Sequence, residues 1–281
     1  TFFTKGQDWG FPPFHPEGLR DQEYRYYIDS LRHHMEHAVL LRIDHVMGLH
    51  RLFWVPHGLG PTEGAYVHYR ADEFYAILNL ESHRHKTKIV GENLGTVPPY
   101  VNRAMIQHGI RGMDVGQFGV HSDPARALED PPADSVSSLN THDTPTFAAF
   151  WEGLDIRDRQ ELGLLDPAQS RQEQESRRCQ RESLATFLKQ RGWLPDGANN
   201  SAAILQAWLA HLAHGPAEFL LVSLEDLWLE TAPQNTPGTW KERPNWRRKT
   251  RHKFEQYAAD PHLLEILRVV DQLRRQRRNG S

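Results

Sequence analysis

The sequence predicts an α/β fold built on a parallel sheet, and two observations lead to this prediction. Short apolar runs alternate with longer segments of helical spacing along the 281-residue chain, as in strands joined by crossover helices. Three of these runs end at an acidic residue, Asp44, Glu92 or Asp143, and then pass into a loop that contains Gly or Thr. In a β/α barrel the carboxyl ends of the strands carry the active site, so the pattern predicts that these acids are functional.

The predicted strands and helices follow one another in a regular order. Apolar runs predict strands over residues 38–44, 87–92, 111–118, 134–140 and 218–223. Helical spacing predicts helices over residues 19–37, 72–85, 98–108 and 260–278. Pro98 suits the first turn of its helix, because a proline there loses no intrahelical hydrogen bond. Gly and Pro predict a loop over residues 45–70, and prolines predict a long loop after Thr231.

The segment between the fourth and fifth predicted strands differs in composition. Residues 155–214 are predicted as a helical insertion, and the charged, Gln-rich part over residues 169–191 indicates a surface helix. Five strands are too few to close an eight-stranded barrel. We therefore expect residues 1–281 to form a single catalytic portion of an open barrel.

Charge and cysteine content narrow the possible partners. The 33 Lys and Arg residues nearly balance the 36 Asp and Glu residues, so we expect no nucleic acid partner. The single cysteine, Cys179, excludes an internal disulfide and suits a reducing compartment, which predicts a cytoplasmic location. No apolar run approaches the roughly 20 residues that cross a bilayer, and no signal peptide is visible, so we expect no membrane partner.

Each acid also has a simpler structural interpretation. An acidic residue after a strand often caps the next helix, so Asp143 could cap residues 144–151 and Glu92 could begin the helix that follows it. Asp44 is harder to explain in this way, because Arg42 and His45 flank it and can hold a carboxylate ionised. Three such strand ends in one chain favour the functional interpretation.

Six motifs between residues 6 and 249 are specific enough to indicate a family. They are Gly6-Gln7-Asp8-Trp9-Gly10, Arg42-Ile43-Asp44-His45, Gly64-Ala65-Tyr66-Val67, Gly91-Glu92-Asn93-Leu94-Gly95-Thr96-Val97-Pro98, Thr141-His142-Asp143-Thr144, and Pro237-Gly238-Thr239 with Pro244-Asn245-Trp246-Arg247-Arg248-Lys249. In order and spacing they resemble amylomaltase, the 4-α-glucanotransferase branch of the α-amylase superfamily.

The resemblance implies a fold and a reaction. The family fold is a (β/α)8 TIM barrel, and the motifs resemble those of about strands four to eight. We therefore expect an incomplete barrel, completed by a missing N-terminal part of the same protein. The family transfers α-1,4-glucan segments between maltodextrins by a retaining double displacement, which implies maltodextrin or starch-type partners and no cofactor or metal.

The resemblance also implies a role for each acid. Asp44 would be the nucleophile, Glu92 the general acid and base, and Asp143 a ligand of hydroxyl groups on the reacting glucose. Arg42 can stabilise the charge of Asp44 from the same face of the strand, and the negative Asp44 favours the protonated form of Glu92. The predicted substrate-binding residues are Arg42, His45, His142, Trp9, Tyr66 and Asn93, with Phe2 and Phe3 near the loop that covers the cleft.

Two residues depart from the family pattern. Asn93 follows the predicted acid and base, where many relatives have Asp, and Phe11 follows the Trp9-Gly10 pair, where Asn is usual. Neither is one of the three acids, so these departures bear on acceptor preference and loop detail, and the reaction class stays the same.

Other functions remain open at this point. A hydrolytic α-amylase relative would use the same acids with water as its preferred acceptor, and an inactive truncated fragment would at most bind maltodextrin. His33 and His37 have helical spacing, but the chain contains no His-Glu-x-x-His zinc motif. Residues 91–95 lack the lysine and the glycine spacing of phosphate-binding loops. The basic run over residues 246–249 is short, and such runs are usually solvated or ion-paired.

Overall fold

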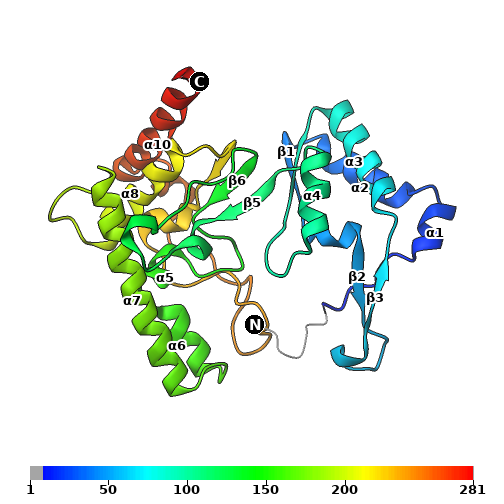
Figure 1. Ribbon diagram of the computed structural model, residues 1–281, viewed down its shortest axis with the longest axis horizontal. Helices are drawn as coiled ribbons and strands as arrows, with labels where there is room; N and C mark the ends of the chain where they lie inside the picture. Colours follow the sequence, from blue (N-terminus) through cyan, green and yellow to red (C-terminus); the bar gives the residue numbers. More distant parts are fainter. Residues whose placement is uncertain (1–8, 281) are drawn as a thin grey trace. The chain divides into compact units, whose positions relative to one another are not determined.

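A computed structural model describes residues 9–280 of the chain (Figure 1). The chain divides into two compact units, Thr1–Met113 and Asp114–Ser281. The boundary falls inside strand β5, Gly112–Val115. Within the described residues, no helix is both long enough and apolar enough to cross a membrane.

The first unit combines helices with two small sheets. Its helices are α1 (Pro16–Asp21), α2 (Arg25–Met35), α3 (Ala71–His85) and α4 (Pro99–Gln107), and its strands are β1 (Leu40–Ile43), β2 (Arg51–Trp54), β3 (Ala65–His68) and β4 (Lys88–Gly91). Strands β1 and β4 are parallel, whereas β2 and β3 form an antiparallel hairpin. A parallel bridge joins Val90 of β4 to Arg111, the residue directly before β5.

A single apolar cluster holds the first unit together. Leu31 of α2, Leu78 of α3 and Met105 of α4 pack in it with Ile89 of β4. Each of these side chains is at most 5% exposed, and burying such a side chain contributes about 1.5–3 kcal/mol. The apolar faces of these helices therefore fix the position of β4, the strand that leads to Glu92.

The predicted helix over residues 19–37 is wrong in one respect, because the structure has two helices there. Glu23 and Tyr24 lie between α1 and α2 with φ of 52° and 57°, a left-handed conformation that interrupts a helix. The Tyr24 ring packs edge-on against Phe74 of α3, with 5.3 Å between ring centroids. This tertiary contact stabilises the break, and the spacing of apolar residues within the segment does not reveal it.

The predicted loop over residues 45–70 also contains more structure than expected. Strands β2 and β3 pair within it, with Phe53 opposite Tyr66 and Trp54 opposite Ala65. Each strand is short and is surrounded by Gly and Pro, so neither stands out in the sequence. Pairing across the intervening turn, rather than local spacing, decides this hairpin.

The second unit contains a parallel sheet segment and most of the helical residues. Its strands are β5, β6 (Ser135–Ser138) and β7 (Phe219–Leu221), and its helices are α5 (Phe147–Glu152), α6 (Leu154–Glu161), α7 (Pro167–Gln190), α8 (Ser201–His214), α9 (Phe254–Tyr257) and α10 (Pro261–Gly280), with a short 3-10 helix, η5 (Leu224–Trp228), after β7. The strand order is β5-β6-β7, and β6 and β7 are parallel.

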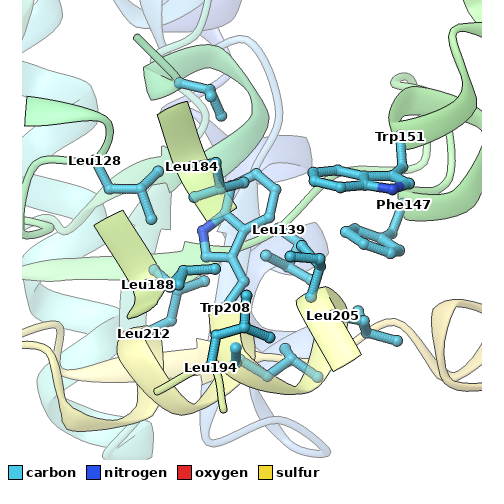
Figure 2. Close-up of a cluster of buried hydrophobic side chains, with 14 of the residues drawn as sticks. Leu128, Leu139, Phe147, Trp151, Leu184, Leu188, Leu194, Leu205, Trp208 and Leu212 are labelled. Atoms are coloured by element: carbon cyan, nitrogen blue, oxygen red, sulfur yellow. The ribbon is translucent and has the colours of Figure 1, made fainter. Parts of the chain in front are cut away.

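Helices α5 to α8 all lie between β6 and β7 in the chain, and α5, α7 and α8 supply most of the buried apolar cluster of the second unit. Figure 2 shows Trp208 of α8 among Phe147 and Trp151 of α5 and leucines of α7. The predicted surface character of residues 169–191 therefore holds for only part of the helix. Its last turns bury Leu184 and Leu188, because these residues face α8 and not solvent.

All five predicted strands are present, each somewhat shorter than expected. They do not form one sheet in the structure: β1 pairs with β4, and β5, β6 and β7 form a second group. The α/β class is thus confirmed, while the incomplete barrel and the single catalytic portion stay predictions.

Candidate active site

The first two acids follow directly after two neighbouring parallel strands. Ile43 of β1 lies opposite Gly91 of β4, so the next residues, Asp44 and Glu92, form the next step of the same register. Beyond the last pair, the Glu92 backbone N–H donates to the carbonyl oxygen of Ile43 at 2.8 Å, and the Val46 N–H donates to the carbonyl oxygen of Glu92 at 3.0 Å. Strands pair about 4.8 Å apart, which places the two acids side by side at the carboxyl ends of β1 and β4.

Gly91 allows β4 to pack closely just before Glu92. A Cβ atom at this position would lie 2.8 Å from Cγ2 of Val46 and 2.9 Å from Cε of Met105. Both neighbours are buried in the apolar cluster of the first unit. The glycine is therefore required by close packing against the segment that follows Asp44.

Backbone N–H groups hold the carboxylate of Glu92. Oε2 accepts a hydrogen bond from the His45 N–H at 2.9 Å, and Oε1 accepts one from the Leu94 N–H at 2.8 Å. His45 has a φ of 44°, and this left-handed turn directly follows Asp44. The next helix, α4, has Pro98 as its N-cap, so the interpretation of Glu92 as a helix-capping residue is wrong.

Asp44 has the cationic neighbour that the sequence predicts. Nη1 of Arg42 lies 2.6 Å from Oδ1 of Asp44, and the Asp44 side chain is 71% exposed. Nε of Arg42 points to Sδ of Met113 at 3.4 Å, which keeps the guanidinium beside the strand end. Asp44 is thus paired with a cationic side chain and remains open to an incoming ligand.

His45 and Trp9 form an aromatic pair beside these acids. Their rings meet edge to face with 5.1 Å between centroids, and Trp9 is 52% exposed. Burial lowers the pKa of His45, while the negative charges of Glu92 and Asp44 act in the opposite direction. A neutral imidazole in this position can both donate and accept hydrogen bonds, as sugar hydroxyls require. Residues 6–8 of the same motif, and Phe2 and Phe3, lie outside the described residues.

Tyr66 lies on the β2–β3 hairpin, and its aromatic ring is partly exposed to solvent. Phe53 meets it edge to face at 5.1 Å, and the guanidinium of Arg51 stacks 4.0 Å from its ring centre. Gly64 makes room for this arrangement, since a Cβ there would lie 2.5 Å from Cε1 of Phe53. Tyr66 is nevertheless 53% exposed, so it can accept the apolar face of a sugar.

Asn93 is engaged within the protein. Its Oδ1 accepts from the Met113 N–H at 2.9 Å, and its Nδ2 donates to Oδ1 of Asn102 at 3.0 Å. These bonds connect the loop after Glu92 to β5 and to α4. A contact between Asn93 and substrate stays a prediction, and the observed bonds give it a supporting role.

The third acid, Asp143, belongs to the second unit and lies on the loop between β6 and α5. Its Oδ1 accepts a hydrogen bond from Nδ2 of Asn235 at 2.6 Å, and its Oδ2 lies 3.2 Å from Nε2 of His142. Thr146, not Asp143, caps α5, because its hydroxyl oxygen accepts from the Ala149 N–H. The interpretation of Asp143 as a helix cap is therefore also wrong.

Sequence reasoning assigned no role to Asn235 or Trp246, although both lie beside the predicted site residues of the second unit. The Trp246 ring lies 5.6 Å from that of His142, and the Trp246 backbone N–H donates to the backbone carbonyl oxygen of Gln234 at 2.8 Å. Asn245 ties this loop together by accepting from the Thr236 N–H at 2.9 Å. Trp246 belongs to the family motif over residues 244–249, but the motif alone does not indicate what this side chain does.

The structure thus brings together two groups of predicted residues. Asp44, Glu92, Arg42, His45 and Trp9 gather in the first unit, and His142 and Asp143 in the second. Convergence of all three acids on one substrate stays a prediction. Within residues 9–280, no three His, Cys, Asp or Glu side chains form a group that could hold a metal ion.

The basic run over residues 246–249 is partly paired with acids. Arg248 makes two 2.7 Å hydrogen bonds to the carboxylate of Glu225, and Glu230 lies 3.7 Å from the same guanidinium. This pairing agrees with a structural role in the second unit.

Two curated 4-alpha-glucanotransferases are similar to this chain. The protein of Mycobacterium tuberculosis is 39% identical over 253 residues, an alignment that covers 88% of this chain and 35% of that protein. The protein of Haemophilus influenzae is 34% identical over 251 residues, covering 87% of this chain and 36% of that protein. The chain therefore spans about a third of the length of the curated relatives it matches.

Solved structures and a family model agree with this result. Amylomaltase from Corynebacterium glutamicum is 26% identical, with a TM-score of 0.83 over 96% of this chain and 41% of that one. Amylomaltase from Streptococcus agalactiae, solved with acarbose, shares the fold at 18% identity, with a TM-score of 0.69 over 95% of this chain and 48% of that one. A family model described as 4-alpha-glucanotransferase matches residues 1–254. The chain belongs to the 4-alpha-glucanotransferase family.

Proposed function

We propose that this chain carries the catalytic acids of a 4-α-glucanotransferase, which transfers α-1,4-glucan segments between maltodextrins with retention of configuration. The observation that carries the proposal is that Asp44 and Glu92 each directly follow one of two adjacent parallel strands, so they lie side by side at the carboxyl ends of β1 and β4. Retaining glycosidases need two carboxyl groups about 5–5.5 Å apart, and side chains at the ends of two adjacent strands can reach this separation. Family membership supports the same reaction.

In the proposed reaction, Asp44 attacks the anomeric carbon and forms a covalent glucosyl ester. Glu92 protonates the oxygen of the leaving glucan as the glycosidic bond breaks. Glu92 then takes the proton from the 4-hydroxyl of an acceptor glucan, whose oxygen displaces Asp44 and forms the new α-1,4 bond. The ion pair with Arg42 supports this role for Asp44, because a nucleophilic carboxylate must be ionised.

The other predicted residues bind the sugar in this proposal. Asp143 and His142 would accept and donate hydrogen bonds to the reacting glucose, and these bonds would strengthen in the transition state. His45 would bind hydroxyl groups from the side of the first two acids. No step requires a cofactor.

The balance between transfer and hydrolysis depends on the acceptor. Trp9 and Tyr66 are each about half exposed, which supports stacking against a glucan. An acceptor held in this way has a high effective concentration and outcompetes water for the glucosyl ester. A hydrolytic α-amylase type of activity is the alternative, in which water would be the main acceptor.

The proposal also concerns the barrel strands that residues 1–281 do not supply. We propose that the chain supplies about strands four to eight of a (β/α)8 barrel, and that an N-terminal part of the same protein supplies the others. The chain spans about a third of the length of the curated relatives, as one part of a larger barrel would. The cytoplasmic location stays a prediction.

The test is product analysis after incubation of the full-length protein with maltotriose. We expect glucose together with maltodextrins longer than maltotriose, and little net gain in reducing ends. The Asp44→Asn variant is the control and should form neither. Formation of maltose and glucose alone, with reducing ends that rise in step, would establish the hydrolase instead.

A further inference from the structure

A buried carboxylate outside the predicted site bridges the two ends of the loop that carries Asp143. Asp226 lies on η5 and is 1% exposed. Its Oδ2 accepts a hydrogen bond from Nδ2 of Asn140 at 2.7 Å, and its Oδ1 accepts one from the Phe147 N–H at 2.8 Å. Asn140 precedes the His142-Asp143 pair by two residues, and Phe147 is the first residue of α5.

The segment between these two contacts is short and internally bonded. The Thr141 N–H donates to Oγ1 of Thr144 at 2.9 Å, and the Asp143 N–H donates to Oγ1 of Thr141 at 3.2 Å. Gln117 of the second unit donates to the oxygen of Pro145 at 3.0 Å. The Gln117 backbone N–H also donates to the backbone oxygen of Leu139 at 3.0 Å, so Gln117 spans the loop as well, while Asp226 bridges Asn140 and Phe147.

Asp226 itself is buried beside the apolar core of the second unit. It belongs to the turn that also buries Leu227 in the core of the second unit. Burial raises the pKa of Asp226 to about 6, partly offset by its two hydrogen bonds and reinforced by the negative charge of Glu225. Both carboxyl oxygens have a donor, so the group satisfies two polar groups near the core that would otherwise lose a partner.

We propose that Asp226 is a positioning residue for the transferase reaction, which fixes the end of β6 and the start of α5 and so sets the place of Asp143 between them. The inference rests on the role proposed for Asp143 above. Asp226 acts through the loop, and we assign it no contact with substrate. Its removal should loosen both ends of a loop whose side chains must be placed to within a fraction of an ångström.

The two-point bridge, and not the negative charge, is what the geometry requires. In Asp226→Asn, the side-chain oxygen can still accept from Phe147, and the new amide can donate to Asn140 once the Asn140 amide has turned over. Asp226→Ala leaves both donors without a partner. Asn140→Asp places two acids face to face, whereas the double change Asn140→Asp with Asp226→Asn restores one donor and one acceptor.

The experiment measures kcat and KM for maltotriose disproportionation by the full-length protein carrying each change. We expect Asp226→Ala and Asn140→Asp to lower kcat about 10- to 100-fold with KM within about threefold, since a displacement of about 1 Å can cost 10²-fold. Asp226→Asn and the double change should stay within about threefold of the wild type. Asn140 is only partly buried, so Asn140→Asp tests the bridge even where Asp226→Ala does not fold.

Two controls separate positioning from general loss of stability. Glu81→Gln alters another nearly buried carboxylate, one paired with Arg32 at 2.9 Å in the first unit, and should lower the melting temperature without changing kcat. In the Asp143→Asn background, Asn140→Asp should have little further effect on kcat, because the group that it misplaces has already been disabled.

The outcomes are distinct. Absence of disproportionation activity in the wild type would contradict the proposed function. An active wild type with unchanged kcat in both Asp226→Ala and Asn140→Asp would overturn the positioning role alone. Full additivity with Asp143→Asn, or failure of the double change to recover kcat, would also overturn it.

Discussion

The two units hold their acids in different ways. In the first unit, Glu92 accepts hydrogen bonds from the backbone N–H groups of His45 and Leu94, and the parallel ladder places it beside Asp44. In the second unit, Asp143 accepts from the side chain of Asn235, 92 positions away along the chain. Its loop is bridged by the side chain of Asp226.

This difference has a physical consequence. Backbone donors are present whichever side chain a residue carries, so the position of Glu92 follows from strand pairing and close packing. Side-chain donors are lost with a single substitution, so the position of Asp143 depends on residues of a distant loop. The surroundings of Glu92 should therefore tolerate substitutions better than those of Asp143.

The largest expected effect tests whether the acids themselves matter. Glu92→Gln should lower kcat for maltotriose about 10²- to 10⁴-fold, because protonation of the leaving oxygen and activation of the acceptor are both lost. Initial rates of glucose release measure it. The amide keeps one oxygen that accepts a backbone hydrogen bond but turns its NH2 group toward the other N–H, so a modest decrease in melting temperature should accompany the loss of kcat. Activity within tenfold of the wild type would remove Glu92 from the mechanism.

The next effect concerns stability and pH in the second unit. Asp226 has a pKa of about 6 when folded and an ordinary value of 3.8. Between these values the folded protein binds a proton that the unfolded chain has released, so stability falls as the pH rises from about 4 to 6. At low pH, protonated Asp226 contributes about 3 kcal/mol to the free energy of unfolding, and this contribution is fully lost above the folded pKa.

Urea unfolding of the wild type and of Asp226→Asn at pH 4.5 and 7 measures this contribution. The wild type should lose more stability than the variant on going to pH 7, because an amide does not titrate. Parallel changes in the two proteins would show that Asp226 does not carry the proton.

A smaller effect tests the contrast between side-chain and backbone donors directly. Asn235→Ala should lower kcat about 10- to 100-fold, since a hydrogen bond to a charged group is worth about 1.5–3 kcal/mol. Leu94→Ala is the matched change in the first unit. It keeps the N–H that Glu92 accepts from, so kcat should stay within about threefold. Equal losses in the two variants would contradict the comparison.

The smallest effect concerns packing behind Glu92. Gly91→Ala should destabilise the protein by about 1–3 kcal/mol, because its methyl group would meet Val46 and Met105 at less than 3 Å. Gly119→Ala is the control, as no atom lies within 4 Å of a Cβ there. Chemical denaturation of both variants measures the difference. A Gly91→Ala variant as stable as the Gly119→Ala variant would show that β4 can move away.

Much of the fold could be predicted because it rests on local pattern. The apolar runs that end at Asp44 and Glu92 predicted β1 and β4, and helical spacing predicted α3, α4 and α10. The ion pair between Arg42 and Asp44 was also predictable, since the two residues share one face of a strand. The break between α1 and α2 was not, because a contact with Phe74 stabilises it.

The sequence alone predicted which residues would carry the chemistry, namely three acids that follow strands and their flanking His and Arg, and its motifs indicated the family. Only the tertiary structure decided how those acids are held. The pairing of β2 with β3, the approach of Asn235 to Asp143 and the bridge made by Asp226 all join residues that are far apart in the chain. Such contacts leave no periodic signal, because they depend on where folding brings each segment and not on the order of neighbouring residues.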